Sequence, residues 1–275
     1  MTENEYQHYL LYWEIPLLES YIEKLEEAFE NELSNTFIER SLLNVLIRSY
    51  PQCILVLKEV ICLVKNGYPD GALARSRRIY ENMIIATYLN KHKTDADFQK
   101  VIDRYFDDHH IRANYGKRKV YLNANQTDKA RECYETINKL VKKHTTSKNI
   151  NKKRDEIISN NYWWAKNSPM SFGKLSECFD DEYAKLLYLR ACYSIHAGAY
   201  GDVALLGRPH SDEARLYSGR TYNGAATSMQ LAVSSFCNIT EIVFENFGVE
   251  SPISNQEFIK LIQTYIQNGY EEMNV

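Results

Sequence analysis

The stretch from Trp13 to Phe29, WEIPLLESYIEKLEEAF, places apolar side chains at about every third or fourth position. This spacing follows the 3.6-residue period of an α-helix that buries one face. We predict a helix over residues 6–33, in which Pro16 allows a bend. The apolar stripe comprises Trp13, Leu17, Leu18, Tyr21, Ile22, Leu25 and Phe29.

The composition extends this interpretation to the whole chain. Among 275 residues there are 11 glycines and 6 prolines, too few for the many tight turns of an all-β fold. Hydrophobic residues make up 44% and charged residues 25%, which is typical of a globular protein with a buried core. The sequence therefore predicts an all-α protein whose 275 residues form a single helical domain.

Further helices follow from periodicity and from capping and turn residues. Thr36 and Glu39 form a capping box, and Pro51 is expected to kink or break the helix that they start. The segment 66–71, NGYPDG, is a turn. Thr94 and Asp97 can cap the helix after that. The predicted helices after the first cover residues 36–65 and 72–91. The next begins at the Thr94–Asp97 cap and reaches residue 113, and another begins at residue 127. The last three cover residues 182–197, 225–246 and 254–269.

The chain has the features expected of an intracellular, cytoplasmic protein. Its first residues are acidic and polar, unlike a secretory signal. The longest apolar stretch, 53–64, is interrupted by Lys58 and Glu59 and cannot span a bilayer. The six cysteines are widely spaced, which gives no support for a zinc site, and we expect reduced thiols and no membrane partner.

The charge pattern limits where RNA could bind. The net charge is −3 and the pI about 6.2, whereas proteins that coat nucleic acid are usually basic. Between Lys139 and Arg154 there are seven Lys or Arg residues and no acidic residue. This run is either a solvated helix end or mobile loop, or an RNA-contacting patch. Its candidate RNA-binding residues are Lys142, Lys143, Lys152 and Lys153.

The segment Arg190–His196, RACYSIH, holds the residues needed for metal-independent RNA cleavage. A histidine can take the proton of the 2′-hydroxyl, and an arginine can stabilise the charge that develops on the phosphate. Six positions leave the two side chains about 120° apart on a helix, so a second subunit could bring its own copy alongside. The alternative is a histidine at a helix end beside a surface arginine.

Two other groups of residues could take part in chemistry. Arg77 and Glu81 lie four residues apart on one helix face, where they could orient a catalytic group or fix helix packing. Asp103, Asp107 and His110 also share a face and could ligate a divalent metal, or form a wet helix surface. The sequence has no phosphate-binding glycine loop and no common hydrolase motif.

The segment 71–81, GALARSRRIYE, followed by Tyr88 and Leu89, resembles the opening motif of the bacterial domain-of-unknown-function family numbered five-six-seven-seven. Arg77 and Glu81 match its Arg–Glu pair, and 103–106 is similar to its Arg-plus-aromatic segment. The segment 183–196 resembles its tyrosine and histidine signature, in which Tyr188, Cys192 and His196 form one stripe. Cys192 stands where the family has a serine. The resemblance covers residues 67–201, which leaves residues 1–66 and 225–269 as additional helices at the two ends.

That family in turn resembles the HEPN superfamily of helical bundles, many of which are ribonucleases in bacterial conflict systems. The resemblance implies a metal-independent endoribonuclease that acts as a defence or toxin effector and needs no cofactor. It implies a homodimer with catalytic His196 and Arg190, supported by Arg77, Glu81, Tyr188 and Cys192. RNA and a protein from a defence or toxin system would be its partners.

Other functions are compatible with the same residues. One is a non-catalytic interaction or sensor protein, in which His196 is packed inside one subunit. Another is a metal-dependent hydrolase that uses Asp103, Asp107 and His110.

Overall fold

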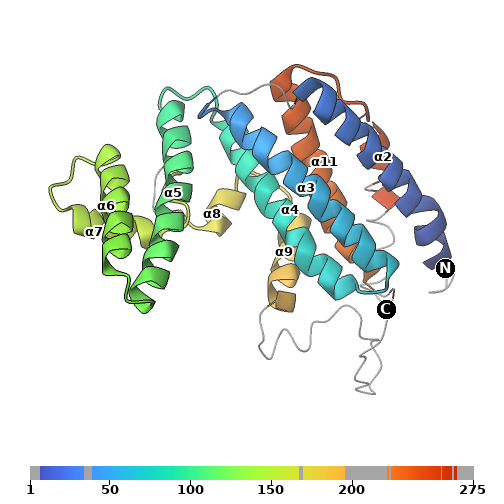
Figure 1. The fold of residues 1–275 in the computed structure, drawn as a ribbon. Helices are drawn as coiled ribbons and strands as arrows, with labels where there is room; N and C mark the ends of the chain where they lie inside the picture. The colour runs from blue at the N-terminus through green and yellow to red at the C-terminus, as the bar shows by residue number, and fades with distance from the viewer. Residues whose placement is uncertain are drawn as a thin grey trace. The chain divides into compact units, whose positions relative to one another are not determined.

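A computed structural model of the protein describes residues 7–33, 39–166, 170–195, 222, 224–254, 256–261 and 263–264. In these residues every regular element is a helix, which confirms the predicted all-α fold class (Figure 1). Within the same ranges, no helix combines the length and the apolar character needed to cross a membrane.

The helices belong to two compact units. Unit 1 consists of residues 1–38, 43–90 and 179–275, and unit 2 of residues 39–42 and 91–178. The segment 67–201, for which the sequence suggests a family-like core, therefore contributes helices to both units. Each unit is described separately below.

Unit 1 begins with a helix whose turns are partly of π type. The π segments η1 (Leu10–Glu14) and η2 (Phe29–Leu33) flank the α-helix α2 (Ile15–Ala28). Leu18, Tyr21, Ile22, Leu25 and Phe29 of the predicted stripe are buried, but Trp13 and Leu17 are 67% and 46% exposed. Trp13 lies within η1, where hydrogen bonds between residues i and i+5 change the angular spacing of the side chains, whereas Leu17 lies in α2 at the edge of the buried stripe.

The other long helices of unit 1 are α3 (Leu42–Lys65), α4 (Pro69–Lys91), α9 (Glu182–Ile195) and α11 (Ala225–Phe247). Helix α3 continues through Pro51. The predicted turn between α3 and α4 is present, with Gly67 at a φ of +75°, a conformation that glycine adopts without steric cost. Thr36, the predicted cap of α3, lies outside the described residues.

Aromatic rings and small residues form the core of unit 1. Tyr50 on α3 stacks on Phe236 of α11 with ring centroids 5.7 Å apart, and its hydroxyl lies 3.1 Å from Oγ1 of Thr240. Ser76 on α4 donates a hydrogen bond to the backbone oxygen of Ser228 on α11. Such a contact requires close helix backbones, which the small side chains of α11 permit.

Unit 2 consists of α5 (Phe98–Asn123), α6 (Thr127–Lys143), α7 (Ile150–Ser159) and the short α8 (Phe172–Ser176). Helix α5 packs along α6 and extends ten residues beyond the predicted end at 113. The residues after 113 are mostly polar, so periodicity did not reveal the extension. A core cluster in this unit is formed by Ile111, Ile137, Val141, Ile157 and Trp163.

Candidate functional site

Helices α4 and α9 of unit 1 are joined by three of the four residues that the sequence suggests as supporting residues. Nε of Arg77 donates a 2.7 Å hydrogen bond to Oε1 of Glu81, and the two groups form an ion pair. The hydroxyl of Tyr188 donates to the same oxygen at 3.2 Å. The guanidinium carbon of Arg77 lies 5.6 Å from the centroid of the Tyr188 ring, within the range of a cation–π interaction.

The fourth supporting residue, Cys192, lies one turn beyond Tyr188 on α9 and is a hydrogen-bonding neighbour of its hydroxyl. On its other side, the Tyr188 ring stacks on Tyr80 with centroids 4.9 Å apart. Burial, and after it the Glu81 carboxylate, raise the pKa of Tyr188. The hydroxyl therefore stays protonated at neutral pH and serves as a hydrogen-bond donor. We call Arg77, Glu81, Tyr188 and Cys192 the α4–α9 cluster.

Arg190 lies on α9, two residues after Tyr188 and on a different face of the helix. Its Nη1 atom is buried and makes no hydrogen bond within the described part of the chain. A buried guanidinium nitrogen without an acceptor is a group that an anionic ligand could satisfy. The predicted catalytic His196 lies outside the described residues, so the structure does not give the distance between His196 and Arg190.

Residues 43–212, more than half of the chain, match a family of unknown function, DUF5677. The chain is a member of the DUF5677 family. The matched segment contains α4, α9 and the whole α4–α9 cluster. No curated protein and no solved structure matches the chain.

In this DUF5677 protein the four candidate RNA-binding lysines lie in unit 2, at the end of α6 and in α7. Lys142 and Lys152 are exposed. Lys143 forms a 2.9 Å ion pair with Asp107, and Lys153 forms a 3.1 Å pair with Glu156. Half of these charges are thus already paired with carboxylates.

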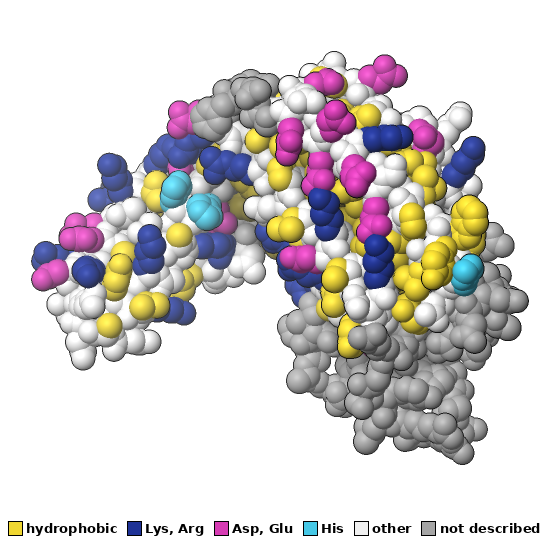
Figure 2. Space-filling model, turned by 45° about the vertical axis from the view of Figure 1, so that its right-hand side comes forward, with side chains coloured by type: hydrophobic (Ala, Val, Ile, Leu, Met, Phe, Trp, Pro, Cys, Tyr) yellow, Lys and Arg dark blue, Asp and Glu magenta, His cyan; other side chains and the backbone are white. Residues whose placement is uncertain are grey.

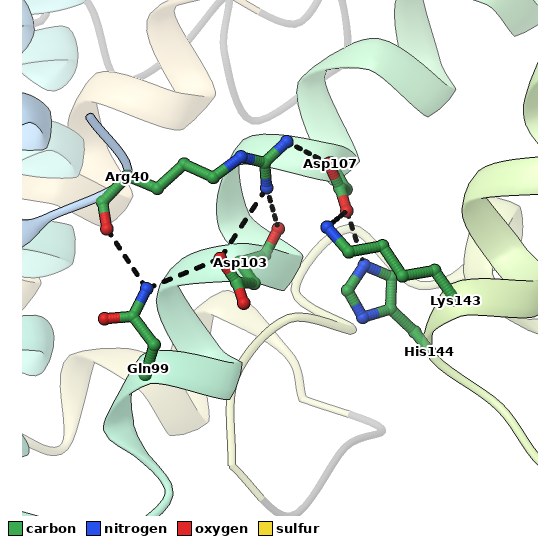
Figure 3. A network of polar contacts seen from close by, with 6 residues as sticks. All are labelled: Arg40, Gln99, Asp103, Asp107, Lys143 and His144. Carbon is green, nitrogen blue, oxygen red and sulfur yellow. Dashed lines mark hydrogen bonds and ion pairs between the residues drawn. The ribbon is translucent and has the colours of Figure 1, made fainter.

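The partner of Lys143 is the centre of a polar network in unit 2 (Figure 3). The side chain of Asp107 on α5 is fully buried and accepts hydrogen bonds from Arg40 at 2.6 Å and Lys143 at 2.9 Å. Nε2 of His144 lies 2.6 Å from the same carboxylate. Burial by itself would raise the pKa of Asp107, but the hydrogen bonds from Arg40, Lys143 and His144 lower it to about 2.

The network argues against the metal site that Asp103, Asp107 and His110 could have formed. Figure 3 shows the guanidinium of Arg40 between Asp103 and Asp107. Because basic side chains surround the Asp107 carboxylate, its oxygens are committed to them. His110 is exposed on α5, and the described residues contain no group of three suitable metal ligands.

Neither Arg40 nor His144 was identified by sequence analysis. Arg40 precedes α3 with a φ of +48°, unusual for a residue with a side chain. Its backbone oxygen accepts a hydrogen bond from Gln99. His144 follows α6, and its ring lies against Trp163 with centroids 5.5 Å apart. These partners are distant in sequence, so no local motif marks them.

Proposed function

We propose that this DUF5677 protein is a metal-independent endoribonuclease of the HEPN type that acts as a homodimer in a bacterial defence or toxin system. The observation that carries the proposal is the α4–α9 cluster. Arg77 and Glu81 of α4 contact Tyr188 of α9, the helix that also bears Arg190 and precedes His196 in the sequence. Tyr188 and Glu81 hold α9 against α4 and so fix the position of Arg190.

In the proposed reaction, the 2′-oxygen of a ribose attacks the adjacent phosphorus and the bond from phosphorus to the 5′-oxygen breaks. His196 takes the proton from the 2′-hydroxyl, and the same residue of the second subunit donates a proton to the leaving 5′-oxygen. Arg190 stabilises the negative charge on the non-bridging oxygens. The products are a 2′,3′-cyclic phosphate and a 5′-hydroxyl.

The α4–α9 cluster would act as a positioning group. Arg77 neutralises Glu81, and Glu81 holds the Tyr188 hydroxyl, so α9 is fixed by contacts that do not involve Arg190. The buried Nη1 of Arg190 then has no internal acceptor in the described residues. A phosphate oxygen in contact with this atom would supply the missing acceptor, as a phosphate clamp requires.

The test is cleavage of a labelled single-stranded RNA in EDTA by the wild type, by His196→Ala and by His110→Ala. His110 is an exposed histidine of α5 and serves as the matched control. We expect the wild type and His110→Ala to yield 2′,3′-cyclic phosphate ends and His196→Ala to yield none. Overexpression should arrest growth only where cleavage is retained.

Two results would contradict the proposal. Equal cleavage by the wild type and His196→Ala would remove the role of His196, and loss of wild-type cleavage in EDTA would remove the metal-independent mechanism. A wild type that never cleaves RNA would instead favour a non-catalytic interaction or sensor protein.

A further inference from the structure

Unit 2 contains a hollow of about 490 Å³ that none of the motifs above predicts. Helices α5, α6 and α7 line it, and Ile137 and Ile158 form the apolar part of its wall. Its polar and aromatic lining includes Tyr115, Arg118, Tyr134 and Arg154. The volume lies in the range of pockets that hold small organic ligands, and a single nucleotide is such a ligand.

Two guanidinium groups meet at one aromatic ring in this hollow. The guanidinium carbons of Arg118 on α5 and Arg154 on α7 lie 5.3 Å and 4.7 Å from the centroid of Tyr134 on α6. Both distances are within the range of cation–π interactions, so the ring holds two like charges near each other. The hydroxyl of Tyr134 donates to Asn151, which also accepts from Arg154.

The two arginines differ in how their charge is balanced. Arg154 forms a 3.0 Å ion pair with Asp155, which also lines the hollow. For Arg118, the described residues provide no carboxylate partner. A hydrogen bond with Asn138, and after it one with Arg154, lower the pKa of Tyr134, in keeping with a cationic site. Arg118 therefore supplies most of the uncompensated charge of the hollow.

The surroundings of the hollow are basic although the chain is acidic. From Tyr115 to Arg154 the sequence has twelve Lys or Arg and three Asp or Glu, against a net charge of −3 overall. Lys and Arg side chains gather on the surface of unit 2 in Figure 2. Tyr115 pairs with Lys119 at 4.6 Å in a further cation–π contact. Cationic and aromatic groups that alternate in this way suit single-stranded nucleic acid, which offers phosphates and unpaired bases.

We propose that the hollow lined by Tyr115, Arg118, Tyr134 and Arg154 binds single-stranded RNA. Arg118 and Arg154 contact a phosphate. An adjacent base stacks on the planar guanidinium groups that lie against the Tyr134 ring. The inference rests on the proposed function only for the choice of RNA as ligand. It places the main RNA contact in the hollow and not on Lys142, Lys143, Lys152 and Lys153.

The test is fluorescence anisotropy with a labelled 12-nucleotide 2′-O-methyl oligouridine, which has no free 2′-hydroxyl and so is not cleaved by the proposed reaction. Arg118→Gln is compared with Lys139→Gln, which removes the same charge from the opposite, exposed face of α6. We expect Arg118→Gln to raise Kd roughly tenfold. The plot of the logarithm of the association constant against the logarithm of the salt concentration should become less steep by about 0.7. Lys139→Gln should change Kd less than twofold.

A second pair of variants tests the ring. Tyr134→Phe keeps the aromatic surface and should bind almost as the wild type does, whereas Tyr134→Leu should raise Kd roughly tenfold. A 12-base-pair RNA duplex should bind more weakly than the single strand, because its bases are not free to stack. Circular dichroism melting of each variant separates loss of binding from loss of fold.

The inference would be overturned by equal effects of Arg118→Gln and Lys139→Gln, by equal binding of duplex and single strand, or by no binding of RNA to the wild type. Binding in the hollow without cleavage would reject the proposed ribonuclease and leave the inference standing. Cleavage that is independent of Arg118 and Tyr134 would reject the inference alone.

Discussion

The hydroxyl of Tyr188 donates a hydrogen bond to Oε1 of Glu81, 107 residues earlier in the chain. The same oxygen accepts from Arg77, so one carboxylate joins the Arg–Glu motif of α4 to the tyrosine stripe of α9. Both motifs lie in the segment that matches the family, and this carboxylate links them. Changes in either should affect both helices.

The first prediction concerns the energy of this link. Because Tyr188 and Glu81 share a hydrogen bond, Tyr188→Phe and Glu81→Leu, which removes the acceptor, should destabilise the protein by less in combination than the sum of their separate effects. We expect a coupling free energy of about 1 kcal/mol in a double-mutant cycle measured by urea unfolding. The same cycle between Tyr188→Phe and Glu23→Gln, an exposed residue of α2, should give no coupling; strict additivity in both cycles would contradict the link.

The second prediction concerns Asp107 and acid. Its folded pKa of about 2 lies below its ordinary value of 3.8, so the unfolded state binds a proton more readily. The resulting stabilisation, about 2 kcal/mol, is present above pH 3.8 and is lost as the pH falls toward 2. Asp107→Asn should cost about 3 kcal/mol at pH 7 and much less at pH 2, since it leaves basic groups without their carboxylate.

Asp128→Asn is the control for this measurement, because the Asp128 side chain is 87% exposed. Urea unfolding at a series of pH values should show no difference between this variant and the wild type. A loss in Asp107→Asn that is equally large at pH 2 and pH 7 would show that charge is not the cause.

The third prediction is that stability falls as the pH rises, the reverse of the effect of Asp107. Burial raises the pKa of Glu14 from 4.5 to about 7, so the folded state holds a proton that the unfolded state releases. This contribution to stability is complete below pH 4.5 and is lost as the pH rises to 7, by about 3 kcal/mol. Glu14→Gln should therefore stabilise unit 1 at pH 8 and have little effect at pH 4.5. Glu23→Gln is the control, and it should leave the midpoint of urea unfolding unchanged at both pH values.

The fourth prediction separates two adjacent lysines. Both lysines are exposed, but the Lys143 ammonium forms an ion pair with the buried Asp107 carboxylate. Lys143→Gln should lower stability by about 1 kcal/mol, and Lys142→Gln should change it by less than about 0.5 kcal/mol. Thermal unfolding followed by circular dichroism gives both values. Equal melting temperatures for the two variants would mean that Arg40 and His144 satisfy Asp107 without Lys143.

The fifth prediction addresses the proposed phosphate clamp. A lysine keeps the charge of Arg190 but lacks its planar pair of donors. In the RNA cleavage assay we expect Arg190→Lys to lower kcat/KM about tenfold and Arg190→Gln about a hundredfold. Arg131→Gln is the matched control, since the Arg131 side chain is 70% exposed. If Arg190→Gln cleaves as fast as this control, Arg190 is not the clamp.

Local pattern was sufficient for most of the helices. The periodic stretches that we identified correspond to α2, α3, α4, α6, α9 and α11, and the glycine-containing turn before α4 was also correct. Helix α5 was predicted too short because its last turns carry polar residues. Trp13, which the periodicity placed on the buried stripe, is exposed and lies within the π segment η1, which periodicity does not reveal.

For the candidate site, the sequence placed Arg77 and Glu81 on one face of a helix and Tyr188 and Cys192 on one face of another. Side chains three or four residues apart on a helix are neighbours wherever that helix packs. Only the tertiary structure decided that these two faces meet. The same holds for Asp107 with Arg40 and for Tyr134 with Arg118. Such contacts depend on how helices pack, and helix packing is set by the whole core and not by any short segment.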